Sequence, residues 1–175
     1  MTIPTGTFTI DTAHSELGFT VRHSGIAKVR GRFNGVTGTV TIAEDFASSS
    51  AQVEIDAASV HTGNEQRDGH LVSPDFWDAA NKPTWTFNST SIVGAGEEFT
   101  LNGDLTINGI TKPVALAVEY NGSATGMAGE VLGFSATTEI SRKDYDLTWN
   151  VALEGGGLLV GDTVKIAIEI EAARA

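Results

Sequence analysis

The stretch "FTLNGDLTINGITKPVALAVEY", residues 99–120, contains two runs of alternating apolar and polar residues joined by Asn108-Gly109. Alternation with a period of two places successive side chains on opposite faces of a strand. An Asn-Gly pair between two such runs is the strongest short-range indication of a β-hairpin, because both residues accept the positive φ of a tight turn. The stretch therefore predicts two antiparallel strands with one apolar face and one face in water.

The same period of two recurs along most of the chain. Further alternating runs lie at residues 17–23, 36–42, 52–56, 130–140 and 164–171. Asn34-Gly35, Asn121-Gly122 and "GAGE" at 94–97 are further candidate turns. Long strands joined by short turns favour a closed or strongly curved antiparallel sheet. We expect an all-β chain that forms a single barrel domain over residues 1–175, with about eight strands.

One segment breaks the alternation and predicts a short helical insertion near residues 62–80. Polar helix-forming residues are followed there by apolar residues at roughly helical spacing. Thr62 and Asn64 are candidate N-caps, and Pro83 ends the segment.

Composition excludes several classes of protein. There is no cysteine, so disulfides, thiolate metal sites and cysteine nucleophiles are absent. The formal net charge of −11 argues against binding to nucleic acid and to anionic membranes, which both favour clustered Lys and Arg. The beginning, "MTIPTGTFTID", has no features of a secretory signal, which predicts a cytoplasmic location, or a periplasmic or extracellular one only if a leader has been removed.

Asp11, His14 and Ser15 are the residue types of a hydrolytic triad, but their spacing does not favour one. They lie so close in sequence that their side chains diverge along an extended chain, whereas a triad is assembled from separate elements. The four histidines, His14, His23, His61 and His70, show no zinc-binding spacing. We therefore expect no catalytic residue and no metal site, and we interpret Asp11 and Ser15 as partners of backbone groups at the start of a strand.

The predicted barrel has two possible interiors. An eight-stranded closed sheet is just wide enough to be filled by side chains or to hold one slim ligand. Gly38 and Gly103 lie on apolar faces and favour some open space, whereas the aliphatic residues beside them are equally typical of a solid core.

Four separated stretches, in order, resemble the YceI-like family, the bacterial polyisoprenoid-binding domain with a lipocalin-like barrel. They are "FTIDTAHSELGFTVRH" with "VRGRFNGVTGTV", then "NEQRDGHLVSPDFWDAANKPTWTF", "GDLTINGITKPV" and "GFSATTEISRKDYDL". The resemblance implies an apolar pore for a long isoprenoid tail, as in polyprenyl lipids or quinones, and implies binding, transport or storage without turnover. Family members commonly have glycine where this chain has Asp146, so its local turn is expected to differ.

From this resemblance we expect the protein to bind an isoprenoid small molecule, polyprenyl or quinone, with no other cofactor. The predicted ligand-binding residues are Phe19, Val21, His23, Phe33, Leu71, Phe76, Trp77, Trp85, Phe87, Leu105, Phe134 and Arg142. For most of the apolar residues among these twelve, packing in the protein core is as well supported as contact with a ligand. For Arg142 we favour an ion pair with a nearby carboxylate over contact with a phosphate.

Two other functions stay open at this point. One is a redox or stress-related accessory protein that binds haem or a quinone through His14, His23 or His70. The other is a stress-related structural protein with a solid core. A homodimer is compatible with both and with the lipid-binding prediction.

Overall fold

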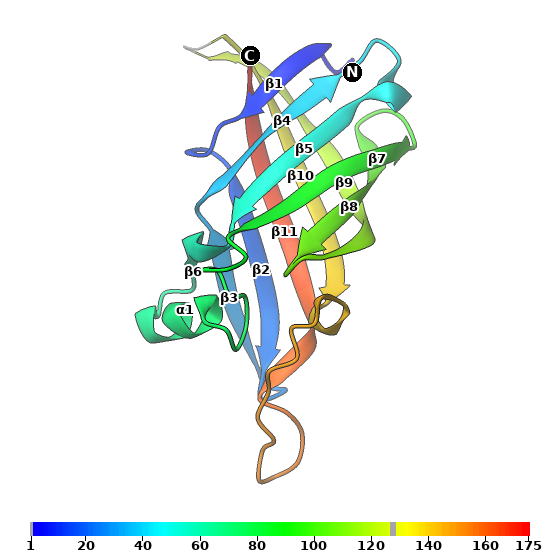
Figure 1. The fold of residues 1–175 in the computed structure, drawn as a ribbon. Coiled ribbons are helices and arrows are strands. Elements are labelled where there is room, and N and C mark those ends of the chain that lie inside the picture. Colours follow the sequence, from blue (N-terminus) through cyan, green and yellow to red (C-terminus); the bar gives the residue numbers. More distant parts are fainter. Residues whose placement is uncertain (1, 127–128) are drawn as a thin grey trace.

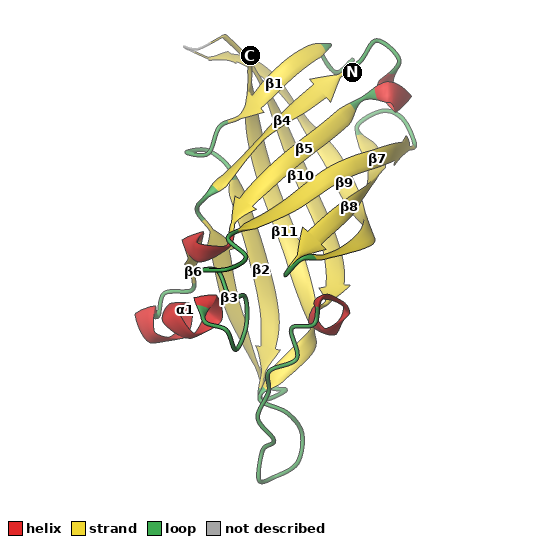
Figure 2. Ribbon diagram, viewed as in Figure 1, coloured by secondary structure: helices red, strands yellow, loops and turns green. Residues whose placement is uncertain are grey.

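Antiparallel strands pair into one sheet that closes on itself in the computed structural model, which describes residues 2–126 and 129–175 (Figure 1). The strands are β1 Gly6–Ile10, β2 Glu16–His23, β3 Ala27–Phe33, β4 Val36–Ile42, β5 Ser50–Asp56, β6 Val60–His61, β7 Thr84–Val93, β8 Glu98–Ile107, β9 Ile110–Gly126, β10 Gly129–Ser141 and β11 Val160–Arg174. The helical elements are α1 Glu65–Val72 and the short 3-10 helices η1 Phe46–Ser48, η2 Ala57–Ser59 and η3 Arg142–Tyr145. Strands dominate the described chain, as the alternation predicts (Figure 2).

Three pairs of short strands act as three long ones, which reduces the barrel to eight strands. β1 and β2 both pair with β11, at residues 172–174 and 160–169 respectively. In the next long strand, β4 pairs with β1 and β3 pairs with β2. In the one after that, β5 pairs with β4 and β6 pairs with β3. Each long strand is thus interrupted once, at residues 11–15, 34–35 and 57–59. The predicted all-β, lipocalin-like barrel of about eight strands is confirmed.

Hydrogen bonds across these interruptions satisfy backbone groups that leave the ladder. The Ser15 hydroxyl donates to the Glu171 carbonyl at 3.2 Å and accepts from the Glu171 N–H at 3.1 Å. The Asn34 N–H donates to the Ser59 carbonyl at 3.1 Å. Ser15 therefore serves the backbone at a strand start, as interpreted from the sequence, since a buried unpaired peptide group is costly.

Turn predictions had mixed outcomes. Asn108-Gly109 joins β8 to β9 with φ values of 55° and 76°, and "GAGE" lies in the turn between β7 and β8. Asn121-Gly122 was wrongly assigned to a turn, because both residues lie inside β9 at a register shift opposite Gly133 and Phe134. Asn34-Gly35 does not make a hairpin, since β3 and β4 are consecutive parts of one long strand.

The predicted helical insertion is present but shorter than residues 62–80. The Asn64 side chain caps α1 by accepting from the Arg67 N–H at 2.9 Å. The helix ends at Val72, and turns that include Trp77 and Ala79 bring the chain back to β7. No helix in the described ranges is both long and apolar enough to cross a membrane.

Side chains fill one end of the barrel. Phe8, Leu132 and Ala172 come from three different strands and are fully buried. Both chain termini lie at this end, here called the terminal end (Figure 1). The opposite end consists of the β2–β3 hairpin and the loop between η3 and β11, and it is here called the loop end.

Candidate functional site

An apolar cavity of about 260 Å³ lies inside the barrel. It is lined by the inward faces of the long strands, with the side of α1 and the loop after η3 completing the wall. The polar side chains on the lining are those of Ser49, Ser50, Thr138 and Arg142. A wall this poor in hydrogen-bonding groups suits a hydrocarbon and offers little to a polar ligand.

The exposure of β11 shows that the interior is not filled like an ordinary core. Val164, Ile166, Ile168 and Ile170 point into the barrel and line the cavity, yet each is only half-buried. Inward aliphatic side chains in a packed interior are normally in contact on all sides. Their remaining accessible surface faces the cavity, which favours the open interior over the solid core.

Eleven of the twelve predicted residues line the cavity. They are Phe19, Val21, Phe33, Leu71, Phe76, Trp77, Trp85, Phe87, Leu105, Phe134 and Arg142. His23 does not line it: the side chain is exposed beside the β2–β3 turn, where its Nδ1 lies 3.3 Å from the Ser24 hydroxyl. Strand parity alone placed it on the inward face, but β11, which pairs with His23 at Val160, has a register shift between Val160 and Val164, and the His23 side chain lies outside the cavity.

Exposure divides the lining residues into two groups. Phe33, Trp77 and Trp85 are almost fully buried, with ring centroids 5.0–5.2 Å apart, so they mainly pack the wall. Phe19 and Val21 are half-buried and present more surface to the interior. Core packing and cavity lining are therefore both realised, by different residues.

The expectation that Gly103 and Gly38 leave open space was wrong. A Cβ atom on Gly103 would lie 2.4 Å from the Phe87 ring, so that ring occupies the space above the glycine. A Cβ atom on Gly38 would lie 2.2 Å from the Gln52 carbonyl oxygen. These glycines permit close packing of the wall, so they are not the source of the open space.

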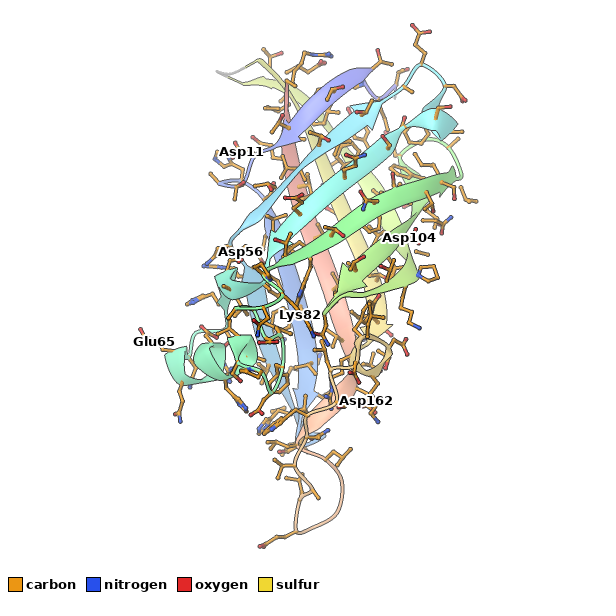
Figure 3. All side chains as sticks on the ribbon, viewed as in Figure 1. Asp11, Asp56, Glu65, Lys82, Asp104 and Asp162 are labelled. Carbon is orange, nitrogen blue, oxygen red and sulfur yellow. The ribbon has the colours of Figure 1, made fainter. Side chains whose placement is uncertain are left out.

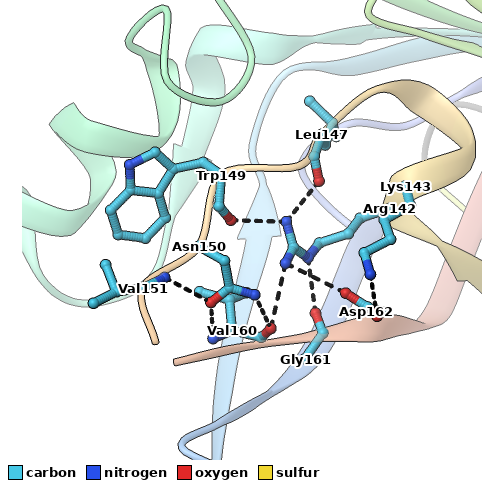
Figure 4. A network of polar contacts seen from close by, with 9 residues as sticks. All are labelled: Arg142, Lys143, Leu147, Trp149, Asn150, Val151, Val160, Gly161 and Asp162. Atoms are coloured by element: carbon cyan, nitrogen blue, oxygen red, sulfur yellow. Dashed lines mark hydrogen bonds and ion pairs between the residues drawn. The ribbon is translucent and has the colours of Figure 1, made fainter. Parts of the chain in front are cut away.

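Arg142 is buried, with 4% of its surface exposed, and it binds the loop that closes the cavity (Figure 4). Its Nη1 donates to the carbonyls of Leu147 at 2.6 Å and Trp149 at 2.9 Å. Its Nε donates to the Gly161 carbonyl at 2.9 Å, and Nη2 donates to the Val160 carbonyl at 3.3 Å and to Asp162 at 3.4 Å.

These contacts use all five N–H groups of the guanidinium. The favoured ion pair is present, with Asp162, and no donor is left for a phosphate. Burial lowers the pKa of Arg142, and the charge of Asp162 opposes that shift. Because the ordinary pKa of arginine lies far above neutral pH, the guanidinium stays charged. What Arg142 presents to the cavity is its aliphatic stem.

Several cavity residues were not among the predicted ones. Phe46 and Phe99 stack edge-to-face at 5.0 Å towards the terminal end, and Val160 and Leu147 contribute from the loop end. The alternation had already placed Phe99 on an inward face, so this residue could have been named from the sequence. Phe46 lies outside any alternating run, and only the closure of the barrel brings it to the cavity.

None of the four histidines, all of them within the described residues, lines the cavity. The Nε2 atom of His70 lies 2.8 Å from Asp75, and the Nδ1 atom of His61 lies 3.7 Å from Asp68. Each of these imidazoles is engaged on the outside of the barrel.

His14, Asp11 and Glu171 bring three potential ligand atoms within 4.8 Å of one another on the outer surface. The Nδ1 atom of His14 lies 2.9 Å from Asp11, and this hydrogen bond raises the pKa of His14 and lowers that of Asp11. An exposed ion pair explains this arrangement fully.

Comparison with known proteins places this geometry in context. The family model for the YceI-like domain matches residues 8–172. UPF0312 protein SA2479 from Staphylococcus aureus is 38% identical over 170 residues, which cover 94% of this chain and 95% of that protein.

Solved structures show the same barrel. The Campylobacter jejuni YCEI protein has a TM-score of 0.73 and 31% identity, covering 100% of this chain and 99% of that one. BcnA from Burkholderia cenocepacia has a TM-score of 0.79 at 24% identity, covering 93% and 98%. A polyisoprenoid binding domain from Saccharophagus degradans has a TM-score of 0.71 at 17% identity, covering 98% and 100%.

Proposed function

This chain belongs to the YceI-like family, and from that premise we propose that its barrel binds and sequesters one long, slim isoprenoid lipid of the polyprenyl or quinone type. The carrying observation is the apolar cavity bounded by half-buried aliphatic side chains. The structural likeness to the polyisoprenoid binding domain from Saccharophagus degradans supports the choice of ligand.

Burial of the hydrocarbon would supply the affinity. Each buried methylene-sized group contributes about 0.8 kcal/mol, so a five-carbon isoprene unit contributes about 4 kcal/mol before the costs of association are subtracted. The cavity volume of about 260 Å³ is just below the usual range for drug-sized ligands, which favours a thin chain over a bulky ring system. The described wall offers a polar head group only the hydroxyls of Ser49, Ser50 and Thr138, so a charged head group would lie at a mouth of the barrel.

The chemistry of the wall supports binding without turnover. Among the described residues, Arg142 is the one titratable side chain on the lining, and its donors are already used. Carrying or storing a hydrocarbon chain needs no more than a dry cavity. General acid–base or nucleophilic catalysis needs a proton-transferring or nucleophilic side chain within reach of the substrate. The haem- or quinone-linked alternative would need an imidazole facing the bound molecule, and the histidines lie elsewhere.

The test is to identify and then displace the bound lipid. Organic extraction of the purified protein followed by mass spectrometry should yield an isoprenoid, and native mass spectrometry should show it bound one to one. Val21→Trp places a large ring in the cavity and should abolish retention while the fold persists. Thr163→Trp adds the same ring on the outer face and serves as the control. Equal retention by the two variants, or a protein that yields no lipid, would refute the proposal.

A further inference from the structure

The loop end of the barrel carries an unusual concentration of positive charge. Residues 16–33, which form the β2–β3 hairpin, hold four of the eleven Lys and Arg residues of the chain and one carboxylate, Glu16. The four are Arg22, Lys28, Arg30 and Arg32, and all are exposed. They lie on the outer face, because Phe19 and Val21 of the same hairpin point into the cavity.

The fold gains little from this arrangement: of the four side chains only Arg32 makes a side-chain hydrogen bond among the described residues, from its Nε to Asn34 Oδ1 at 3.1 Å. Arg22 and Lys28 are directly opposite each other on neighbouring strands, where like charges repel. Within residues 2–126 and 129–175, none of the four cations forms an ion pair with a carboxylate. Lys143 pairs with Asp162 and Lys165 pairs with Glu139, whereas Arg67, Lys82 and Lys112 also lack a carboxylate partner among the described residues, but these three are dispersed along the chain. The concentration of four unpaired cations on one face of an acidic protein suits an external anion.

Exposed apolar side chains lie beside these cations. Ile26, at the tight Ser24-Gly25 turn, is 84% exposed, and Val151 and Leu158 on the adjoining loop are 44% and 47% exposed. The Ser24 N–H donates to the Leu159 carbonyl at 2.8 Å, and the Leu159 N–H donates to the Val151 carbonyl at 2.9 Å, so turn and loop form one tip. Glu154 is the single carboxylate on that loop between residues 147 and 161.

We propose that this tip, formed by the β2–β3 hairpin and the loop at residues 150–158, docks on the surface of an anionic phospholipid bilayer. In this arrangement the exposed apolar side chains of the tip would enter the boundary of the acyl chains, and the neighbouring cations would contact the anionic head groups. A nucleic acid or an acidic protein would engage the cations but would leave the apolar tip in water. This inference goes beyond the proposed function, because it concerns the outer surface of the barrel and not its interior.

The net charge of −11 predicts repulsion from such a membrane, but distance decides which effect prevails. Electrostatic interactions in physiological salt are screened over about 8 Å, whereas β11 alone, with 15 residues, is about 50 Å long. Asp11 and Asp104 lie on the outside of the barrel away from the tip, whereas Asp162 lies at the loop end, where Lys143 and Arg142 pair with it (Figure 3). The local cations therefore determine the potential that a membrane in contact with the tip would experience.

Vesicle flotation tests the proposal. The full chain should float with vesicles of equimolar phosphatidylcholine and phosphatidylglycerol, and should not float with phosphatidylcholine alone. Lys28→Glu should weaken binding by roughly tenfold or more, since each cation near an anionic surface contributes about a fivefold factor and the reversal removes one and adds a repulsion. Ile26→Ser should weaken binding to the anionic vesicles as well.

Matched controls come from other parts of the molecule. Lys112→Glu makes the same charge change on exposed β9, and Val93→Ser makes a comparable apolar-to-polar change at a 60% exposed position by the β7–β8 turn. Both should bind like the wild type. Val21→Trp should also still float, which separates this inference from lipid retention in the cavity. No binding by the wild type, or an equal loss in Lys28→Glu and Lys112→Glu, would overturn the proposal.

Discussion

Arg142→Met should destabilise the protein by about 3 kcal/mol. The substitution keeps most of the aliphatic stem that lines the cavity but removes the guanidinium donors to four backbone carbonyls. The Val160 carbonyl keeps the Asn150 Nδ2 donor at 2.8 Å, so three carbonyls lose their donor, and at about 1 kcal/mol or more each the loss sums to about 3 kcal/mol. Leu147 is buried, whereas Trp149 and Gly161 are half-buried, so water keeps the cost at those two near the lower limit.

The neighbouring residue provides the control for charge. Lys143 is exposed and lies 2.9 Å from the same carboxylate, Asp162, but donates to no carbonyl of the loop in the described structure. Lys143→Met should therefore cost less than about 1 kcal/mol, as expected for an exposed ion pair. Arg142→Lys keeps the charge but has three donors instead of five in a different geometry, so its cost should lie between the two.

Urea denaturation followed by tryptophan fluorescence would measure these differences, with linear extrapolation to water. Trp149 lies on the affected loop and Trp85 in the cavity wall, so the probe reports both regions. If Arg142→Met costs no more than Lys143→Met, the guanidinium is not what holds the loop, and the assignment of a structural role to Arg142 is wrong.

Three further predictions concern single groups. His14→Gln should lower the unfolding temperature most between pH 3.8 and 6.5. The raised pKa of His14 stabilises the fold below pH 6.5, and the lowered pKa of Asp11 stabilises it above pH 3.8. A difference in unfolding temperature that does not vary with pH would contradict the ion pair. Burial raises the pKa of Tyr145 to about 12 from 10, so the free energy of unfolding should fall by roughly 2 kcal/mol as the pH rises through that interval. Tyr145→Phe removes a hydroxyl that has no partner among the described residues, and it should abolish this fall in alkaline denaturation curves. Asp146 has a φ of 57°, so Asp146→Gly should raise stability by about 0.5 kcal/mol in urea denaturation, and a loss of stability would show that the aspartate is not strained there.

The fold could be predicted from the sequence because short stretches of residues determine where its strands and its β8–β9 turn form. The alternation in residues 99–120 and 164–171 assigns each side chain to a face, and Asn108-Gly109 determines its hairpin through its own backbone preference. The same local reasoning failed at Asn121-Gly122, where pairing with β10 on one side keeps the residues in a strand and produces a bulge. A turn dipeptide is overruled when its neighbours in space continue the ladder.

Most of the cavity wall could be predicted in the same way, since inward faces follow from parity. His23 shows the limit: parity assigns it to the inward face, but the neighbouring strand β11 has a register shift between Val160 and Val164, and no local pattern in β2 predicts that irregularity. The role of Arg142 shows another limit. Its five acceptors are two carbonyls of the loop after η3 and two carbonyls and one carboxylate at the start of β11, and no local pattern predicts that they converge on one guanidinium.

By itself, the sequence determined that strands would form, which way their side chains would point, and that these strands belong to a barrel of the YceI-like family. Whether that barrel is hollow was decided only by the tertiary structure. The volume left inside depends on the summed sizes of side chains from eight strands and on where Phe8 and Leu132 fill one end, and such a sum exists only after the sheet has closed.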